Sequence, residues 1–244
     1  MQIYYTCTLR WYLLKFTTML DPHQVVNPDE EVKAALNTLF LTERLEVRNA
    51  MMSVVYIVGK VLSDFVHSDV ASMGLSMTVT SLGLPIGAGL GSSASFSVAA
   101  VASCLRLQAL LAPQQSVQNT GIAGALAGAS KDEAAVPDAA SLGVINGWAF
   151  ASEILLHGSP SGLDNTTSCF GGLVRFSRKN GEKFENIVGV PPLHILLVNT
   201  KVPRSTKALV AGVRVLHDAY PDVVAPMLES MDKIALKFLA LVEE

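Results

Sequence analysis

The sequence has 244 residues, of which 50% are hydrophobic and 16% charged, and its net charge is -3. A charged fraction below the usual quarter, with this many apolar side chains, excludes an intrinsically disordered chain. The 18 Lys and Arg and 21 Asp and Glu form no long block of one sign, so neither nucleic acid nor an anionic membrane surface is expected as a partner. One or two domains that act on a small molecule fit these figures.

Cysteine usage and the N-terminus indicate a cytoplasmic protein. The widely spaced Cys7, Cys104 and Cys169 form no CxxC pair, so reduced thiols are expected rather than disulfides or a zinc site. Residues 1–20 lack the basic-then-apolar order of a secretory signal. Residues between Asp69 and Arg106 carry no charge, but glycines and Pro85 would break a spanning helix, so no membrane segment is expected.

Apolar periodicity predicts a mixed chain. Helical spacing is seen at Val32, Leu36, Leu39 and Phe40, and a second amphipathic pattern covers 45–66. Further helices are predicted at 93–112 and 142–156, with a helical pattern over 205–244 that is interrupted near Pro221 and Pro226. Strands are predicted at 75–82, 171–176 and 194–200, with strand-like stretches in 1–20. Turns are expected at 157–165 and 178–182, and a flexible insertion at 113–141. The mixture indicates an α/β or α+β protein whose best domain boundary is the Pro191-Pro192 pair.

The first chemical motif is a glycine-rich loop between a predicted strand and a predicted helix. It consists of Gly87, Ala88, Gly89, Leu90, Gly91, Ser92 and Ser93. Glycines allow the backbone to approach phosphate oxygens, and the free N–H groups of a helix start favour an anion. The loop is neither a Walker sequence nor G-x-G-x-x-G, and an ordinary glycine turn is the alternative.

The second motif joins two carboxylates. Glu153 lies near the end of its predicted helix and Asp164 follows in the sequence HGSPSGLDN. One carboxylate could hold a divalent cation while the other accepts a proton from a hydroxyl, as phosphoryl transfer requires. Alternatively, Asp164 caps a helix, Glu153 is a solvated helix residue and His157 serves packing or capping.

A third motif, residues 199–207, brings Lys201, Arg204 and Lys207 to the end of a predicted strand. These cations could meet a carboxylate or phosphate; ordinary surface charge, with Ser205 as a helix cap, is the alternative.

The segments PIGAGLGSSAS, WAFASEILLHGSPSGLDN and LLVNTKVPRSTKALVAGVR, in this order, resemble mevalonate kinase of the GHMP kinase superfamily. The resemblance implies the α+β GHMP kinase fold. Residues 1–190 would form part of the N-terminal, ribosomal-protein-S5-domain-2-like domain, and 191–244 would begin the C-terminal α/β domain.

The resemblance also implies a reaction, the transfer of the γ-phosphate of ATP to the 5-hydroxyl of mevalonate in isoprenoid and sterol biosynthesis. The loop from Gly87 to Ser93 would wrap the phosphates, Ser93 and Glu153 would bind Mg²⁺, and Asp164 would accept the hydroxyl proton. Ser161 and Thr206 lie where the family approaches its substrate. A homodimer is implied for the full-length family.

Two features of the family do not occur in this sequence. A strand with a K-x-x-L-x-G-E-H pattern does not precede the loop, and Lys15 does not match it; a late G-A-G-G-G-G segment is also missing. Loss of that lysine removes an electrostatic contribution of about 3 kcal/mol or more. A chain truncated at both ends, without measurable activity, is therefore expected. The alternative function is that of a catalytically incompetent interaction partner of a full-length kinase.

Overall fold

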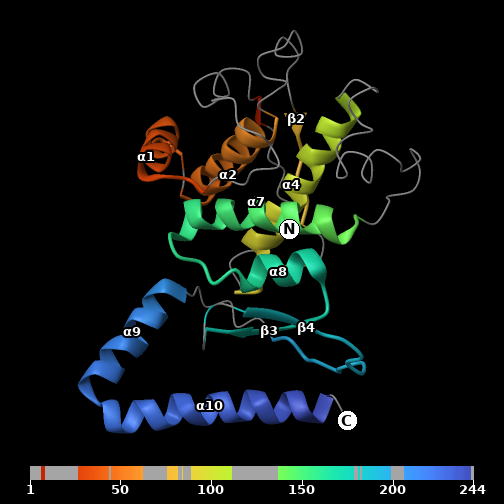
Figure 1. Ribbon diagram of the computed structural model, residues 1–244. Coiled ribbons are helices and arrows are strands. Elements are labelled where there is room, and N and C mark those ends of the chain that lie inside the picture. Colours follow the sequence, from red (N-terminus) through yellow and green to blue (C-terminus); the bar gives the residue numbers. More distant parts are fainter. Residues whose placement is uncertain are drawn as a thin grey trace. The chain divides into compact units, whose positions relative to one another are not determined.

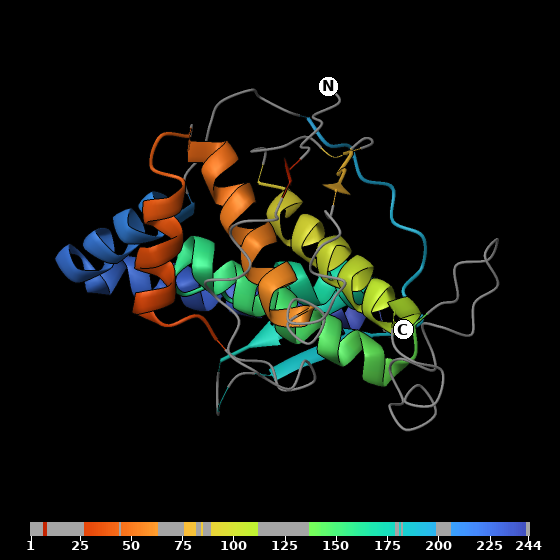
Figure 2. The same cartoon turned by 90° about the horizontal axis from the view of Figure 1, so that it is seen from above.

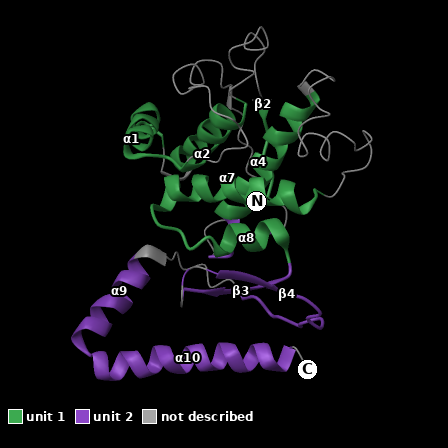
Figure 3. Cartoon of the chain, viewed as in Figure 1, with its two compact units in different colours: residues 1–83, 93–171 green, residues 84–92, 172–244 purple. Residues whose placement is uncertain are grey.

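The computed structural model describes residues 7–8, 27–43, 45–62, 76–81, 84, 89–111, 137–178, 181, 183–198 and 206–242. These residues divide into two compact units, coloured separately in Figure 3. Unit 1 comprises 1–83 and 93–171, and unit 2 comprises 84–92 and 172–244. The limits expected for the two domains, 1–190 and 191–244, stay a prediction.

Unit 1 is mainly helical. Its helices are α1 (Glu30–Leu39), α2 (Leu45–Val61), α4 (Ser92–Leu111), α7 (Ala139–His157) and α8 (Leu163–Phe170). The first residue of α4, Ser92, is counted in unit 2. Two short strands, β1 (Cys7–Thr8) and β2 (Ser76–Met77), pair antiparallel. Figures 1 and 2 show α4 and α7 from two directions, and α7 packs against both α2 and α8. Helix α7 is therefore the element that joins the core to the candidate site.

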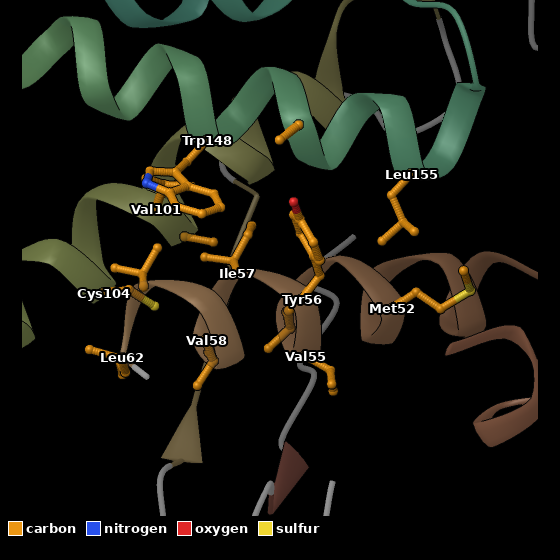
Figure 4. Packing of buried hydrophobic residues seen from close by; sticks show 14 of the residues in the cluster. Met52, Val55, Tyr56, Ile57, Val58, Leu62, Val101, Cys104, Trp148 and Leu155 are labelled. Carbon is orange, nitrogen blue, oxygen red and sulfur yellow. The ribbon is translucent and has the colours of Figure 1, made fainter. Parts of the chain in front are cut away.

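The core of unit 1 lies where α2, α4 and α7 meet (Figure 4). Ile57 from α2, Val101 from α4 and Trp148 from α7 are fully buried. The Trp148 ring meets the Tyr56 ring edge-on, with 6.3 Å between centroids, a geometry that aromatic quadrupoles favour. Burial raises the pKa of the Cys104 thiol, also in this core, to about 12, so this thiol stays protonated and serves packing.

Aspartate caps determine where two of these helices begin. The Asp29 carboxylate accepts a hydrogen bond from the backbone N–H of Val32 at 2.8 Å, and Asp138 accepts one from Ser141 at the same distance. Such caps satisfy N–H groups that a helix start leaves without partners. Because Asp138 caps α7, that helix begins three residues before the predicted 142–156, inside the segment expected to be an insertion.

Unit 2 contains a β-hairpin and two helices. Strands β3 (Leu173–Ser177) and β4 (Lys183–Ile187) pair antiparallel, as a hairpin-type turn at 178–182 would require. The rings of Phe176 and Phe184, which face each other across the hairpin, lie 4.9 Å apart. Helices α9 (Thr206–Ala219) and α10 (Pro221–Val242) follow. Together with unit 1, this gives a mixed helical chain with small sheets, which is compatible with the α+β class.

Four predicted elements differ from the structure. Of the strand predicted at 75–82, the described residues form a strand only at Ser76–Met77, and 194–198 form none because no described strand pairs with them. The turn predicted at 157–165 contains the start of α8. Helix α10 continues through Pro226, which costs one backbone hydrogen bond but leaves the helix unbroken.

Much apolar surface of unit 2 is exposed. Residues Ile195, Leu196, Leu197 and Val198 are exposed, and the described part of α10 has no buried residue. Two helices, Ser92–Leu110 and Ala139–His157, are long and apolar enough to cross a membrane. Core helices of soluble proteins pass the same test, and both helices supply residues to the core of unit 1.

We expect the core of unit 1 to dominate its stability. Ile57→Ala should lower the free energy of unfolding by about 2–5 kcal/mol, because it removes a buried side chain and leaves a cavity. Leu110→Ala, at a 65% exposed position of α4, is the control and should change it by less than about 0.5 kcal/mol. Urea unfolding followed by far-UV circular dichroism measures both. Equal effects of the two substitutions would contradict the observed core.

Candidate functional site

The described end of the glycine-rich loop has the backbone that its glycines predict. Gly89 and Gly91 have φ of +74° and +70°, in the left-handed region that side chains other than glycine rarely adopt. The loop leads directly into α4, whose first N–H groups have no partner within the helix and favour an anion. Gly87 and Ala88 lie outside the described residues, so phosphate binding by the whole loop stays a prediction.

Glu153 on α7 is buried, with 4% of its surface exposed. The Ser93 hydroxyl donates a hydrogen bond to its Oε2 atom at 3.2 Å, and the Ser97 hydroxyl donates to Oε1 at 3.4 Å. The two serines are four residues apart on α4 and therefore share one helix face. Interpreting Glu153 as a solvated helix residue is wrong: this carboxylate faces α4, and a serine contacts each of its oxygens.

Burial determines the electrostatics of this carboxylate. Desolvation raises the pKa of Glu153, while His157 and the two serine hydroxyls oppose that rise by stabilising the charged form. His157 Nε2 lies 3.4 Å from Oε2, the oxygen that also accepts from Ser93. His157 therefore contacts the candidate site, and it is the last residue of α7, which has Gly158 as its C-cap.

Asp164 lies in the first turn of α8, one residue inside the helix. The N-cap is Gly162, with φ of +80°, and it makes no side-chain capping bond, so interpreting Asp164 as the helix cap is wrong. Its side chain is exposed, and its negative charge contributes to the raised pKa of Glu153. The structure thus brings the two predicted carboxylates into electrostatic contact, one buried and one exposed.

Amide side chains attach α8 to α7. Asn165 Nδ2 donates to Asn146 Oδ1 at 2.6 Å, and Asn146 Nδ2 donates to Thr166 Oγ1 at 3.3 Å. Asn165 and Thr166 are buried and directly follow Asp164. These bonds hold the first turn of α8, and with it the Asp164 backbone, against the helix that carries Glu153.

The two residues expected near the substrate differ in what the structure shows. The Ser161 hydroxyl accepts a hydrogen bond from the backbone N–H of Leu163 at 3.3 Å, so it supports the turn into α8. Thr206 begins α9 in unit 2, and its side chain is not described. Residues 199–205 of the third motif lie outside the described residues, and Lys207 lies in α9 without a described side chain.

The oxygen ligands near α4 fit magnesium better than a metal that needs several protein ligands. Among the described residues, no group of three or more His, Cys, Asp or Glu side chains could hold a metal ion. Magnesium is usually held by one or two carboxylates together with waters and substrate phosphates. A buried carboxylate beside a serine hydroxyl at a helix start matches that requirement.

Ser97 is a site residue that the sequence motifs do not include. It follows the glycine-rich loop by one helical turn, and its spacing of four residues from Ser93 is the signal that could have identified it. Its hydroxyl also lies 3.2 Å from that of Ser152, and both serines are fully buried.

Comparison with known proteins supports the motif-based resemblance. The chain is 44% identical over 171 residues to mevalonate kinase of Bos taurus, which covers 70% of this chain and 39% of the bovine protein. It is 44% identical over 154 residues to mevalonate kinase of Homo sapiens, covering 63% and 35%. Mevalonate kinase of Schizosaccharomyces pombe is 29% identical over 229 residues, covering 91% and 50%. No family model matches the chain.

The bovine and human matches span less than two fifths of the relatives' own length. Within that span, the identity is high enough to confirm the resemblance that the three motifs indicated. The matched part of this chain is related to the mevalonate kinases, a family of kinase enzymes.

Proposed function

We propose that this chain carries the chemistry of an ATP-dependent mevalonate kinase, which phosphorylates the 5-hydroxyl of mevalonate in cytoplasmic isoprenoid and sterol biosynthesis. The observation that carries the proposal is the buried Glu153 carboxylate, held between two serines of the helix that follows a glycine-rich loop. The GHMP kinase fold, with domains at 1–190 and 191–244, is part of the same proposal. The kinase activity and the substrate are inferred from the names of the relatives. The geometry of Glu153 and its two serines is that of unit 1.

Ser93 and Glu153 would bind Mg²⁺, and the residues from Gly87 to Ser93 would surround the ATP phosphates. Bound magnesium would neutralise charge on the phosphates and on the departing ADP. The contribution of the chain itself is orientation. The Ser93 hydroxyl contacts the same oxygen of Glu153 as His157 does, so the carboxylate has a defined rotation before any ligand arrives.

Asp164 would act as the general base. Its carboxylate takes the proton of the 5-hydroxyl as that oxygen bonds to the γ-phosphorus and the bond to the β-phosphate oxygen breaks. An exposed side chain suits this role, since the base must reach an incoming alcohol. Ser161 and Thr206 are proposed to contact mevalonate. A homodimer, and the lack of nucleic acid and membrane partners, also belong to the proposal.

The exposed apolar residues of unit 2 favour one alternative. A catalytically incompetent chain that associates with a full-length kinase would use such a surface. Exposed apolar positions in α9 and α10 include Leu209, Val213, Leu216, Met227, Met231 and Ile234.

Cation binding tests the role of Glu153. We expect Glu153→Gln to weaken Mn²⁺ binding in the presence of ADP by at least about tenfold, because the variant loses the charged ligand. Electron paramagnetic resonance of free Mn²⁺ measures the dissociation constant. Glu185→Gln, in the hairpin of unit 2, is the control and should bind like the parent. Unchanged binding by Glu153→Gln would refute the assignment of Glu153.

Asp164→Asn tests the phosphoryl-transfer step separately from nucleotide binding. We expect it to leave the affinity for Mg-ADP within about twofold and to lower any ADP release that depends on mevalonate by about 10²–10⁴-fold, the contribution of a general base. A coupled ADP-release assay and displacement of a fluorescent nucleotide measure the two quantities. Full turnover by Asp164→Asn would exclude it as the base. A parent chain without turnover that cosediments with full-length mevalonate kinase would favour the alternative function.

The raised pKa of Glu153 predicts how stability depends on pH without a bound cation. A carboxyl whose pKa is higher in the folded than in the unfolded chain stabilises the fold below its unfolded value of 4.5, and this stability is lost as the pH rises through the folded pKa. Glu153→Gln should therefore raise the free energy of unfolding more at pH 7 than at pH 4.5. Urea unfolding in EDTA measures this difference, and a larger gain at pH 4.5 would contradict it.

A further inference from the structure

Polar side chains contact both carboxylate oxygens of Glu153, although one oxygen would be enough to bind a cation. Oε2 meets Ser93 at 3.2 Å and His157 at 3.4 Å, on the side where α4 begins. Oε1 meets Ser97 one turn further into α4, where the surroundings are buried. The two carboxylate oxygens thus have different neighbours, and the inner oxygen is contacted by Ser97.

We propose that Ser97 is a positioning residue that fixes the rotation of the Glu153 carboxylate and so presents Oε2 to the cation. This inference rests on the proposed function, in which Glu153 binds Mg²⁺. Ser97 has no exposed surface, so it acts through Glu153 and is not itself a ligand of the cation or substrate. The class of ligand served is a divalent cation bound to a nucleotide phosphate.

The surroundings of Ser97 favour this role over simple packing. The Ser97 hydroxyl has one proton and two acceptors in reach, Ser152 Oγ at 3.2 Å and Glu153 Oε1 at 3.4 Å. A charged carboxylate is the stronger acceptor, because charge-assisted hydrogen bonds are roughly twice as strong as neutral ones. Ser152 and Glu153 are adjacent on α7, so contact with Ser97 also holds this turn of α7 against α4.

A residue that holds a metal ligand in place, without touching the metal, has a measurable effect on metal affinity. Removing a hydrogen-bond partner of a ligand typically weakens metal binding by 10–100-fold, because the ligand loses its orientation. For Ser97→Ala we expect the Mn²⁺ dissociation constant, measured with ADP present, to rise by about tenfold. Nucleotide binding in EDTA should stay within about twofold of the parent, since Ser97 is fully buried and cannot contact a ligand from solvent directly.

The chain offers a matched control in Ser53 on α2. Its side chain is also fully buried, but its hydroxyl has no hydrogen-bond partner among the described residues. Ser53→Ala therefore removes the same atom from a similar environment without touching Glu153, and it should leave the Mn²⁺ dissociation constant unchanged. Ser97→Thr, which keeps the hydroxyl, should restore Mn²⁺ binding to within about threefold of the parent.

A double-mutant cycle tests the contact without any ligand. The changes of melting temperature caused by Ser97→Ala and by Glu153→Gln should be non-additive when combined, because both substitutions alter the same contact. The changes caused by Ser53→Ala and Glu153→Gln should add. Additive changes for Ser97→Ala and Glu153→Gln, or Mn²⁺ binding by Ser97→Ala equal to that of the parent, would overturn the role of Ser97 alone. A parent chain that binds Mn²⁺ no better than Glu153→Gln would overturn the proposed function, and with it this inference, even where the cycle shows coupling.

Discussion

The burial of one carboxylate is the constraint on which the site depends. A charged group out of water is strongly destabilising unless polar partners replace its hydration. For Glu153 two of those partners come from a different helix: Ser93 and Ser97 on α4 each contact one oxygen. Helix α4 must therefore lie against α7 in one register, because a shift of one residue would turn both hydroxyls away. The first turn of α4, which contains Ser93, is positioned by this requirement.

Helix α7 carries this constraint to the second carboxylate. Asn146 lies seven residues before Glu153, two turns earlier on nearly the same face. Its amide bonds to Asn165 and Thr166 hold the start of α8, where Asp164 lies. Trp148, between them in sequence, is buried in the core with Tyr56. One helix thus packs into the core and sets the spacing between the two carboxylates, so core packing and site geometry are not independent.

The sequence predicted the helices better than the strands, for a physical reason. Helix signals are local: the spacing of Leu36 and Phe40 and the break at Pro113 need no distant partner. A strand needs a neighbour, and the apolar run at 194–198 finds none among the described residues. The candidate site likewise has features that a local pattern predicts and features that depend on distant contacts. Ser93, Glu153 and Asp164 stand in motifs, whereas the burial of Glu153 and the contact of Ser97 depend on how α4 meets α7, which no local pattern contains.

The different surroundings of the two carboxylates suit the separate roles proposed for them. A pair of acids with equal exposure would compete for protons and cations alike, but pairs whose environments differ can take separate functions. Glu153 is buried, oriented by three polar groups and shifted toward the protonated form when no cation is near. A bound divalent cation would oppose that shift, since an opposite charge close by favours the ionised carboxylate. Asp164 is exposed and needs no such compensation, and an exposed carboxylate suits the role of general base proposed for it.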